Sequence, residues 1–514
     1  MNTHVKVLIA FALITFIAVF AQGQAALVHN EKGAFEGYTL FTPLSSTTTY
    51  LIDMEGNTVH TWQSNYRPGQ SEYLLEDGYL LKAINPGGMR GNGTFHGGGV
   101  GGGVQKLDWD GNVVWEFSYS DDQHCSHHDI EPMPNGNVLI IAWEKKTAEE
   151  AIAAGRDPDT IGDQLWPDCI IEVKPQGSSD GEIVWQWHVW DHLIQDLDPR
   201  RENYGSGEEH PELVDVNYGG RAAPMPQAQF QRLQSLGDIS GGNRRNRGPR
   251  GGGDSDWNHT NSVDYNAKLD QIVLSVHTFS ELWVIDHSTT TKEAAGHTGG
   301  KYGKGGDLLY RWGNPQAYKM GTAEDQTLFA QHDVQWIEEG LPGAGDLLVF
   351  NNGQGRSGGR YSSVDQVSTP IKKDGSYDRK KDQPFGPEKA EWTYTADNKN
   401  EFFSSHISGA QRLTNGNTLI CSGEKARFFE VTPKGQIVWE YQYSNSTDGR
   451  GGSQPGMGGP FGMGGPGGRG GRGGRGGRGG GPGGMGAGIF RVTRLPKDYP
   501  GLADMDVTVA LKAE

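Results

Sequence analysis

Four histidines occupy similar places in this chain of 514 residues, and they are the first candidates for chemistry. Each stands shortly before a turn that opens an apolar stretch, and they are His128, His259, His332 and His406. Imidazole titrates near neutral pH, so such a group can supply a nucleophile, a general acid and a general base. A lone histidine is more often structural, but four in register among 16 histidines favour a shared site.

An arginine-bearing turn follows the third of these histidines. The apolar stretch 347–350 runs into Asn352, and Gly353 then opens a turn that presents Arg356. A guanidinium stays charged and offers two parallel donors, which suits a sulfate or phosphate group. We expect Arg356 to bind an oxyanion and Asn352 to contact the substrate. A solvated loop arginine is the alternative.

The elements that would position these residues are short strands in repeated units. A phrase of β-branched residues, Trp and a further aromatic residue recurs with variations at Trp62, Trp115, Trp185, Trp312, Trp392 and Trp439. Asn-Gly and Asp-Gly turns before other apolar strands add hairpins. Six such units predict an all-β fold, a six-bladed β-propeller with loop insertions. The first strand of each blade would line the central channel, so the four histidines would point into one funnel. A jelly roll or β-sandwich is the alternative, but neither predicts six copies of one phrase.

The N-terminus is typical of an export signal. Lys6 precedes the apolar run 7–20, and small residues follow it. This run is short for a membrane-spanning helix, which needs about 20 residues. We therefore expect residues 1–25 to be a signal peptide and the rest to be periplasmic or extracellular, with no integral membrane segment after cleavage. An uncleaved anchor is the alternative.

Residues 26–514 are predicted to form a single propeller domain with two interruptions. Residues 196–255 are charged and rich in Gly and Arg, which favours an insertion. Residues 444–488 are a Gly/Arg-rich tract that cannot bury a core, so we expect a disordered loop. Residues 489–495 have strand character again and are expected to close the ring by completing the first blade.

The charge balance and the cysteines narrow the possible partners. The net charge of −17 disfavours nucleic acid and anionic membranes as partners, so an anionic substrate would need a local positive site. Three cysteines, Cys125, Cys169 and Cys421, cannot form a disulfide framework. One pair with a free thiol, or three buried thiols, both remain open. The sequence does not indicate an oligomeric state.

Several of these motifs together resemble the arylsulfate sulfotransferase family. The most specific are Trp257-Asn-His-Thr-Asn-Ser-Val, Gln331-His-Asp-Val and Phe350-Asn-Asn-Gly-Gln-Gly-Arg356. The resemblance covers nearly the whole mature chain apart from the insertion and the Gly/Arg-rich tract. It implies a six-bladed propeller that transfers a sulfuryl group from a phenolic sulfate ester to a phenol. It further implies ping-pong chemistry through a sulfated histidine, with no nucleotide sulfate donor, cofactor or metal.

The resemblance also assigns roles to individual residues. His259 and His332 match channel histidines, and Arg356 matches the sulfate-binding arginine. The covalent histidine corresponds best to His406, with His128 as the second choice. We further expect Trp257 and Phe403 to stack on the phenol rings at the channel mouth.

Two other functions remain as alternatives. Four histidines on a propeller axis can hold a metal ion, but such sites need carboxylates behind the imidazoles. Asp129 and Asp333 directly follow two of the histidines, so their side chains should point to the opposite face of the strand. The other alternative is a propeller that binds a ligand or a partner without catalysis.

Overall fold

The structure is a computed structural model that describes residues 26–88, 92–219, 255–444 and 488–507. The predicted signal peptide, most of the predicted insertion and almost all of the Gly/Arg-rich tract lie outside these residues. None of the helices in the described ranges is long and apolar enough to cross a membrane. All three cysteines are buried free thiols.

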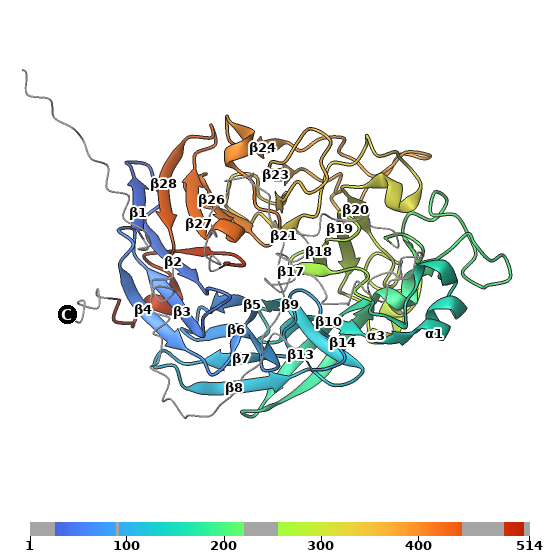
Figure 1. Ribbon diagram of the computed structural model, residues 1–514, viewed down its shortest axis with the longest axis horizontal. Helices are drawn as coiled ribbons and strands as arrows, with labels where there is room; N and C mark the ends of the chain where they lie inside the picture. Colours follow the sequence, from blue (N-terminus) through green and yellow to red (C-terminus); the bar gives the residue numbers. More distant parts are fainter. Residues whose placement is uncertain (1–25, 89–91, 220–254, 445–487, 508–514) are drawn as a thin grey trace, which may run out of the picture.

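Six antiparallel sheets radiate around a central axis, which confirms the six-bladed β-propeller (Figure 1). Blade 1 consists of β29 (Thr493–Pro496), β2 (Gly37–Phe41), β3 (Thr48–Ile52) and β4 (Thr58–Gln63). Blade 2 consists of β5 (Arg67–Leu74), β6 (Leu80–Asn85), β7 (Gly103–Leu107) and β8 (Val113–Ser118). Blade 3 consists of β9 (His124–Pro132), β10 (Val138–Glu144), β13 (Asp168–Gln176) and β14 (Asp180–His188).

The remaining blades follow the same order from the axis outward. Blade 4 consists of β17 (Thr260–Asn266), β18 (Gln271–Val276), β19 (Glu281–Asp286) and β20 (Tyr310–Trp312). Blade 5 consists of β21 (His332–Trp336), β22 (Leu347–Asn351), β23 (Ser363–Val367) and β24 (Trp392–Tyr394). Blade 6 consists of β25 (Gly409–Arg412), β26 (Thr418–Ser422), β27 (Arg427–Val431), β28 (Ile437–Gln442) and an added β1 (Ala26–Asn30).

Short elements decorate the connections. They include α1 (Ala148–Ala153), α3 (Thr291–Ala294) and the strand pairs β11 (Lys146–Thr147) with β12 (Gln164–Leu165) and β15 (Leu193–Ile194) with β16 (Val214–Asp215). The last pair joins the start of the predicted insertion to the end of blade 3, and a buried Arg156 donates to the carbonyl of Val216 beside it.

The six tryptophan phrases are the outermost core strands of the six blades, β4, β8, β14, β20, β24 and β28. Five of the indoles donate a hydrogen bond to the next blade round the ring. Trp115 donates to Asp180 O (2.9 Å), Trp185 to Thr289 Oγ1 (3.2 Å) and Trp439 to Met54 O (2.9 Å). Trp312 and Trp392 donate to Pro387 O (2.7 Å) and Pro433 O (3.1 Å). The repeated Trp therefore joins neighbouring blades, because its ring fills the space between sheets while its N–H finds an acceptor there.

Both ends of the described chain close the ring. β29 pairs with β2 on the inner edge of blade 1, and β1 pairs with β28 on the outer edge of blade 6. The strand begins at Thr493. Ile489 makes only an isolated bridge to Pro43, and Arg491 binds Asp129 and Asp333 of blades 3 and 5. The buried Arg494 side chain then links the blades by donating to Thr39 Oγ1 (2.9 Å) and Phe35 O (2.7 Å) beside Glu430.

The innermost strands carry bulges where they enter the sheet. The register shifts near the start of β5, β9, β17 and β21. Left-handed residues lie within or just before the inner strands of blades 3 to 6: φ is +53° at His128 and His259, +55° at Asp333, and +46° and +92° at Ile407 and Ser408, which precede the unbulged β25. A bulge of this kind turns a side chain out of the regular strand alternation, and it places the histidines described below.

A larger side chain at position 37 should weaken the β2–β29 pairing that closes the ring. A Cβ on this residue would lie 2.1 Å from the carbonyl oxygen of Leu495, so Gly37→Ala must push β2 and β29 apart. We expect a loss of roughly 1–3 kcal/mol in the free energy of unfolding, the usual range for overpacking.

Denaturant unfolding of the two variants Gly37→Ala and Gly358→Ala measures this effect. Gly358 has only ordinary contacts for an added Cβ, the nearest at 3.8 Å. Equal stability of the two variants would show that the β2–β29 pair does not support the ring.

Candidate active site

The four predicted histidines lie at equivalent places at the heads of four inner strands. His128 is in β9, His259 directly precedes β17, His332 begins β21 and His406 stands three residues before β25. All four are buried. Figure 1 shows β9, β17 and β21 together at the middle of the ring. The propeller therefore brings side chains that are far apart in sequence to one end of the central channel.

A fifth histidine, His277, completes a row of imidazoles. The ring centroids are 4.6 Å apart for His128 and His259, 5.0 Å for His259 and His277, and 5.4 Å for His277 and His332. The backbone N–H of Ile407, next to His406, then donates to His332 Nε2 at 3.2 Å. The row thus runs across blades 3, 4, 5 and 6.

Sequence reasoning missed His277 because it follows a second strand, β18, and not a first one. Its backbone N–H donates to the His259 carbonyl at 3.3 Å. The β17–β18 hairpin indicates its position. Val276 pairs with Thr260, so His277, the residue after Val276, must lie opposite His259, the residue before Thr260.

Burial and the neighbouring imidazoles keep part of this row neutral. Burial first, and then the nearby His259, His127, His332 and His277 rings, hold the pKa of His128 well below its ordinary value. Burial and the rings of His259, His332 and His406 do the same to the pKa of His277. Neutral imidazoles keep a lone pair for attack or for a ligand.

A carboxylate lies close to an imidazole in each of blades 3 and 4. Asp256 lies 2.5 Å from His259 Nδ1 and also accepts the indole N–H of Trp143 at 2.9 Å. Asp168 Oδ1 lies 3.3 Å from Nε2 of His127, whose Nδ1 is 2.8 Å from Nδ1 of His128. Nε2 of His128 is buried beside Gly99 and has no hydrogen-bond partner in the described part of the chain.

A glycine gives His128 the space that it occupies. A Cβ on Gly99 would lie 2.0–2.3 Å from three atoms of the His128 ring, and Gly99 has φ +73°. The residue must therefore be glycine for both reasons, backbone and space.

His406 has a similar support made of a hydroxyl and a carboxylate. Its Nδ1 is 2.9 Å from Ser405 Oγ, and that hydroxyl donates to Glu424 Oε2 at 2.7 Å. Because the serine hydrogen goes to the carboxylate, the serine oxygen accepts from Nδ1–H. The lone pair of His406 therefore sits on Nε2, which is buried and has no hydrogen-bond partner among the described residues.

Asn352 holds a histidine in place. Its amide nitrogen donates to the carbonyls of Ser404 and Ile407, both at 2.9 Å, so its oxygen faces His332 Nδ1 at 2.8 Å. That contact puts a proton on Nδ1 of His332. Asn352 is buried and its side chain holds His332 and the His406 loop, and the expected contact with the substrate stays a prediction.

Arg356 lies in the turn beside this network. Its guanidinium donates to Ser363 Oγ at 3.1 Å and lies over the rings of Tyr361 (4.3 Å) and Phe329 (5.4 Å). Burial raises the pKa of Tyr361, but the contacts with Arg356 and Lys399 together outweigh it and lower that pKa overall. The next side chain in the turn, Gln354, donates to the carbonyl of Ser405, so the arginine turn and the His406 loop are joined directly.

Trp257 and Phe403, the two residues expected to stack on the phenol rings, lie in different environments. Trp257 is 2% exposed, packs in the core against Phe279, and donates to the carbonyl of Tyr218 at 2.9 Å. It has little surface to offer a substrate ring. Phe403 is half-buried and directly precedes the Ser404–His406 segment.

Asp129 and Asp333 direct their carboxylates to Arg491, although the bulged backbone at this place is not a regular alternating strand. Both bind Arg491, at 2.6 Å and 3.0 Å, and Arg491 also donates to the hydroxyl of Tyr73. Phe490, the residue before Arg491, lies 6.3 Å from the His128 ring. The segment before β29 thus crosses the channel and ties blades 2, 3 and 5 together beside the histidine row.

The carboxylates that a metal site would need come from other parts of the sequence, namely Asp256, Asp168 and Glu424. However, within the described ranges no three channel histidines place their ligand nitrogens within 4.8 Å of one another. The row fits successive contacts with a substrate better than the compact shell of a metal ion.

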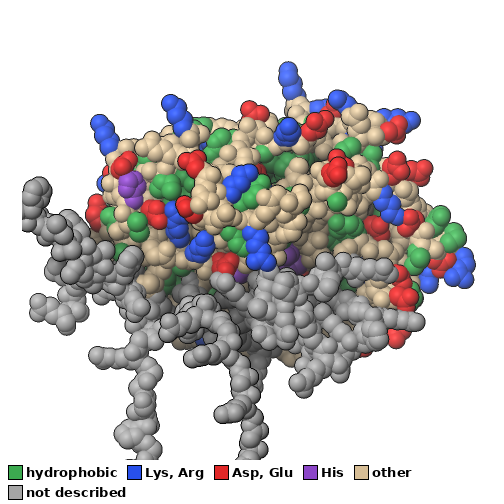
Figure 2. Space-filling model, turned by 45° about the horizontal axis from the view of Figure 1, so that its top comes forward, with side chains coloured by type: hydrophobic (Ala, Val, Ile, Leu, Met, Phe, Trp, Pro, Cys, Tyr) green, Lys and Arg blue, Asp and Glu red, His purple; other side chains and the backbone are tan. Residues whose placement is uncertain are grey.

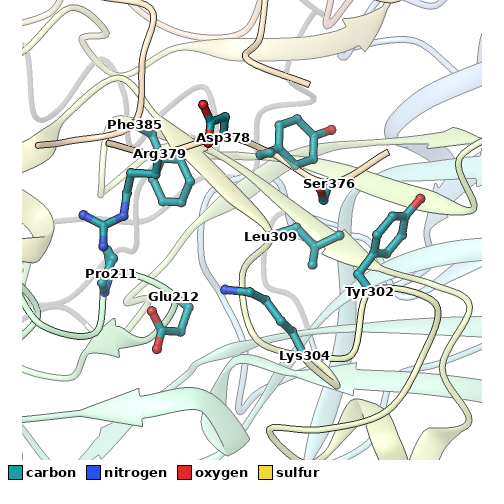
Figure 3. Close-up of a pocket in the computed structure, with 10 residues that line it drawn as sticks. Pro211, Glu212, Tyr302, Lys304, Leu309, Ser376, Asp378, Arg379 and Phe385 are labelled. Atoms are coloured by element: carbon teal, nitrogen blue, oxygen red, sulfur yellow. The ribbon is translucent and has the colours of Figure 1, made fainter. Parts of the chain in front are cut away.

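The surface offers a separate cavity. A pocket of about 250 Å³ lies between the start of the predicted insertion and the connections of blades 4 and 5. Figure 3 shows Lys304 and Glu212 side by side in it, with Arg379 and Phe385 opposite. None of the channel histidines lines this pocket. Acidic and basic side chains are interspersed over the face seen in Figure 2, so the positive side chains do not gather into one patch there.

The amino-acid sequence matches one family of known proteins. Residues 39–449 match the sequence profile of the family described as Arylsulfotransferase (ASST). The chain is 25% identical over 417 residues to the arylsulfate sulfotransferase AssT of Escherichia coli O6:H1, and 25% identical over 409 residues to AssT of Lelliottia amnigena. Each match covers 74% of this chain and 58% of the relative, so the chain spans less than two thirds of these relatives.

Solved structures are more distant. A protein of unknown function from Bacteroides caccae aligns over 80% of this chain and 95% of its own, with a TM-score of 0.40 and 10% identity. A streptogramin B lyase aligns over 82% and 86%, with a TM-score of 0.35 and 10% identity.

The channel histidines should differ from His287 in their response to pH. Burial alone would lower the pKa of His287, but hydrogen bonds to Asp270 (2.7 Å) and Glu172 (3.1 Å) raise it to about 9. We expect His128 and His277 to be neutral and His287 to be charged at about pH 7. Imidazole NMR signals, assigned with His→Gln variants, measure each titration directly.

The directions of these pKa shifts determine how the free energy of unfolding changes with pH. As pH falls below about 6.5, the unfolded chain takes up protons that His128 and His277 refuse, so the free energy of unfolding decreases. The stabilisation from His287 is complete below about pH 6.5 and is lost as pH rises toward about 9. A His128 or His277 signal that titrates at its ordinary value would contradict the electrostatics described here.

Proposed function

We propose a function on the premise that the chain belongs to the arylsulfotransferase family, as the match over residues 39–449 shows. We propose that it transfers a sulfuryl group from a phenolic sulfate ester to a phenol in two steps, through a sulfated histidine. It would use no nucleotide sulfate donor. The observation that carries the proposal is the buried Nε2 of His406, whose lone pair is left for attack by the contacts of Nδ1.

In the first step His406 Nε2 would attack the sulfur of the ester. A new N–S bond forms as the S–O bond to the aryl group breaks, and the electron pair leaves with the phenolate. The chain from Ser405 to Glu424 would stabilise the positive charge that develops on the imidazole. In the second step the acceptor phenol attacks the same sulfur, and Nε2 leaves with its lone pair.

The leaving phenolate needs a proton, and His259 is the best placed histidine to supply it. The Asp256 carboxylate on Nδ1 stabilises the protonated imidazole and holds its orientation, whereas His128 and His277 are kept neutral. In the second step the same imidazole, now neutral, would take the proton of the acceptor phenol.

Negative charge on the sulfuryl oxygens requires donors. Arg356 is our candidate for holding the anionic group, since its turn is joined to the His406 loop through Gln354. Phe403 could contact the aryl ring from the His406 loop.

A metal centre in the channel is the second candidate. The observation that favours it is the Asp256–His259 contact, which is common behind metal-ligating histidines. The spacing of the ligand nitrogens argues against it, as described above. Activity that survives a chelator, with a sulfated protein intermediate, would exclude a metal role in the transfer.

The covalent step can be tested by intact mass. After mixing with a chromogenic aryl sulfate and no acceptor, the wild-type protein should gain one sulfuryl group, and added phenol should remove it. His406→Ala should show no gain, and its turnover should fall by at least roughly a thousandfold. His287→Gln is the matched control, because His287 lies outside the channel row.

If the mass gain persists in His406→Ala and is lost in His128→Ala, His128 is the nucleophile. If the wild type neither gains mass nor releases phenol, the propeller is not a transferase for this class of substrate, and ligand binding without catalysis becomes the better account.

The acid–base role predicts a different effect for Asp256→Asn. We expect kcat to fall by about 10²–10⁴-fold for donors with poor leaving groups, and much less for activated ones that need no protonation. The mass gain with an activated donor should remain. An equal loss for both kinds of donor would assign Asp256 to structure alone.

A further inference from the structure

A second group of histidines lies away from the channel, at the outer part of blades 3 and 4. His192 ends the short 3-10 helix Val189–His192 that follows the outer strand β14, and His297 and Asp307 lie in the connection between β19 and β20. One ligand atom from each of the three lies within 4.8 Å of the others. The channel histidines, by contrast, head the inner strands.

When His192 is neutral, its contact with Asp307 has no hydrogen between the two acceptor atoms. Nε2 of His192 is 2.9 Å from the carbonyl oxygen of Ala294, which can only accept, so Nε2 carries the hydrogen. In the neutral ring Nδ1 is then a lone pair, yet it lies 2.9 Å from Asp307 Oδ1, another acceptor. His192 is fully buried and Asp307 is nearly so, which makes facing lone pairs costly. A cation between them, or an extra proton, must resolve the conflict.

The third group and the surroundings favour a metal ion. His297 Nδ1 is 2.7 Å from the same Asp307 oxygen, and its ring is 60% exposed, so water can reach the site from that side. Two imidazole nitrogens, a carboxylate oxygen and a water form a common tetrahedral zinc set. At zinc–ligand lengths of about 2.0–2.2 Å the ligand atoms lie about 3.3 Å apart, so a small outward movement would admit the ion.

The scaffold holds His192 firmly. Its ring stacks on Trp187 with centroids 5.6 Å apart, and the Trp187 indole donates to the carbonyl of Gly306 at 2.7 Å. A Cβ on Gly306 would lie 2.6 Å from His192 Nε2, so this residue must be small for the ring to fit. Such fixed orientation of a ligand is what metal sites require.

We propose that His192, His297 and Asp307 form a zinc site that ties the end of blade 3 to the β19–β20 connection of blade 4. The site would be structural and separate from the proposed sulfuryl transfer. Neither inference depends on the other.

Calorimetric titration with Zn²⁺ after removal of metals by a chelator tests the site. The wild-type protein should bind one more zinc ion than His297→Ala does. If the variant still binds that ion, its affinity should be lower by more than the 10–100-fold that the loss of an outer contact typically costs. His297→Ala should fold normally, because the side chain is largely exposed. Cobalt(II) should give the visible absorption of a tetrahedral site in the wild type only.

Two controls separate this site from other histidines. His210→Ala removes an exposed histidine that contacts Glu212, and it should bind zinc as the wild type does. His406→Ala should also retain the outer zinc ion, whatever it does to sulfuryl transfer. Equal zinc uptake by the wild type and His297→Ala, or no uptake by either, would overturn the proposal and leave an imidazolium–carboxylate cluster.

Discussion

The bulged, left-handed backbone at the heads of the inner strands is the constraint on which the channel depends. A regular strand would point alternate side chains into the sheet packing on either side. In blades 3 to 6 a residue with φ between +46° and +55° lies within the inner strand or just before it, at or next to a channel histidine. Such conformations cost about 1–3 kcal/mol each for residues other than glycine, so the surrounding structure must hold them.

That surrounding structure is a set of polar contacts behind the imidazoles. Asp256, Ser405 with Glu424, and Asn352 each contact Nδ1 of one channel histidine, and His127 contacts Nδ1 of His128. Nε2 of His332 is also in use, because it accepts from the backbone N–H of Ile407. On the opposite face of the same strands, Asp129 and Asp333 clamp Arg491. Arg491 therefore anchors the inner strands of blades 3 and 5, and the chain before β29 contributes both to ring closure and to the position of these strands.

The fold was predictable from the sequence because its repeat is visible at the level of residue type. Trp at the outer strands marks each blade, since the same packing problem between neighbouring sheets recurs six times. The histidines at the strand heads were also visible, because they recur at one place in the repeat. The contacts behind them were not. Asp256 and Glu424 are 3 and 18 residues from the histidines they support, with no pattern that distinguishes them from other surface carboxylates.

The residues whose surroundings the sequence did not indicate share one physical reason. His277 was missed because it belongs to a second strand, and only strand pairing places it opposite His259. Trp257 looked like a substrate platform by its neighbours in sequence, but its ring packs inside the core. Asn352 was expected at the substrate, yet its three contacts hold His332 and the His406 loop. Side-chain direction at a bulge depends on backbone angles that residue types do not reveal.

The central claim is that a protein histidine carries the sulfuryl group between donor and acceptor. The stereochemical course at sulfur tests it most directly, with an aryl sulfate made chiral by three oxygen isotopes and analysis of the product ester. Each displacement at sulfur inverts the configuration, so two successive transfers predict overall retention. Inversion would mean that the acceptor attacks the donor directly, and the channel histidines would then act only as acid, base and anion binders.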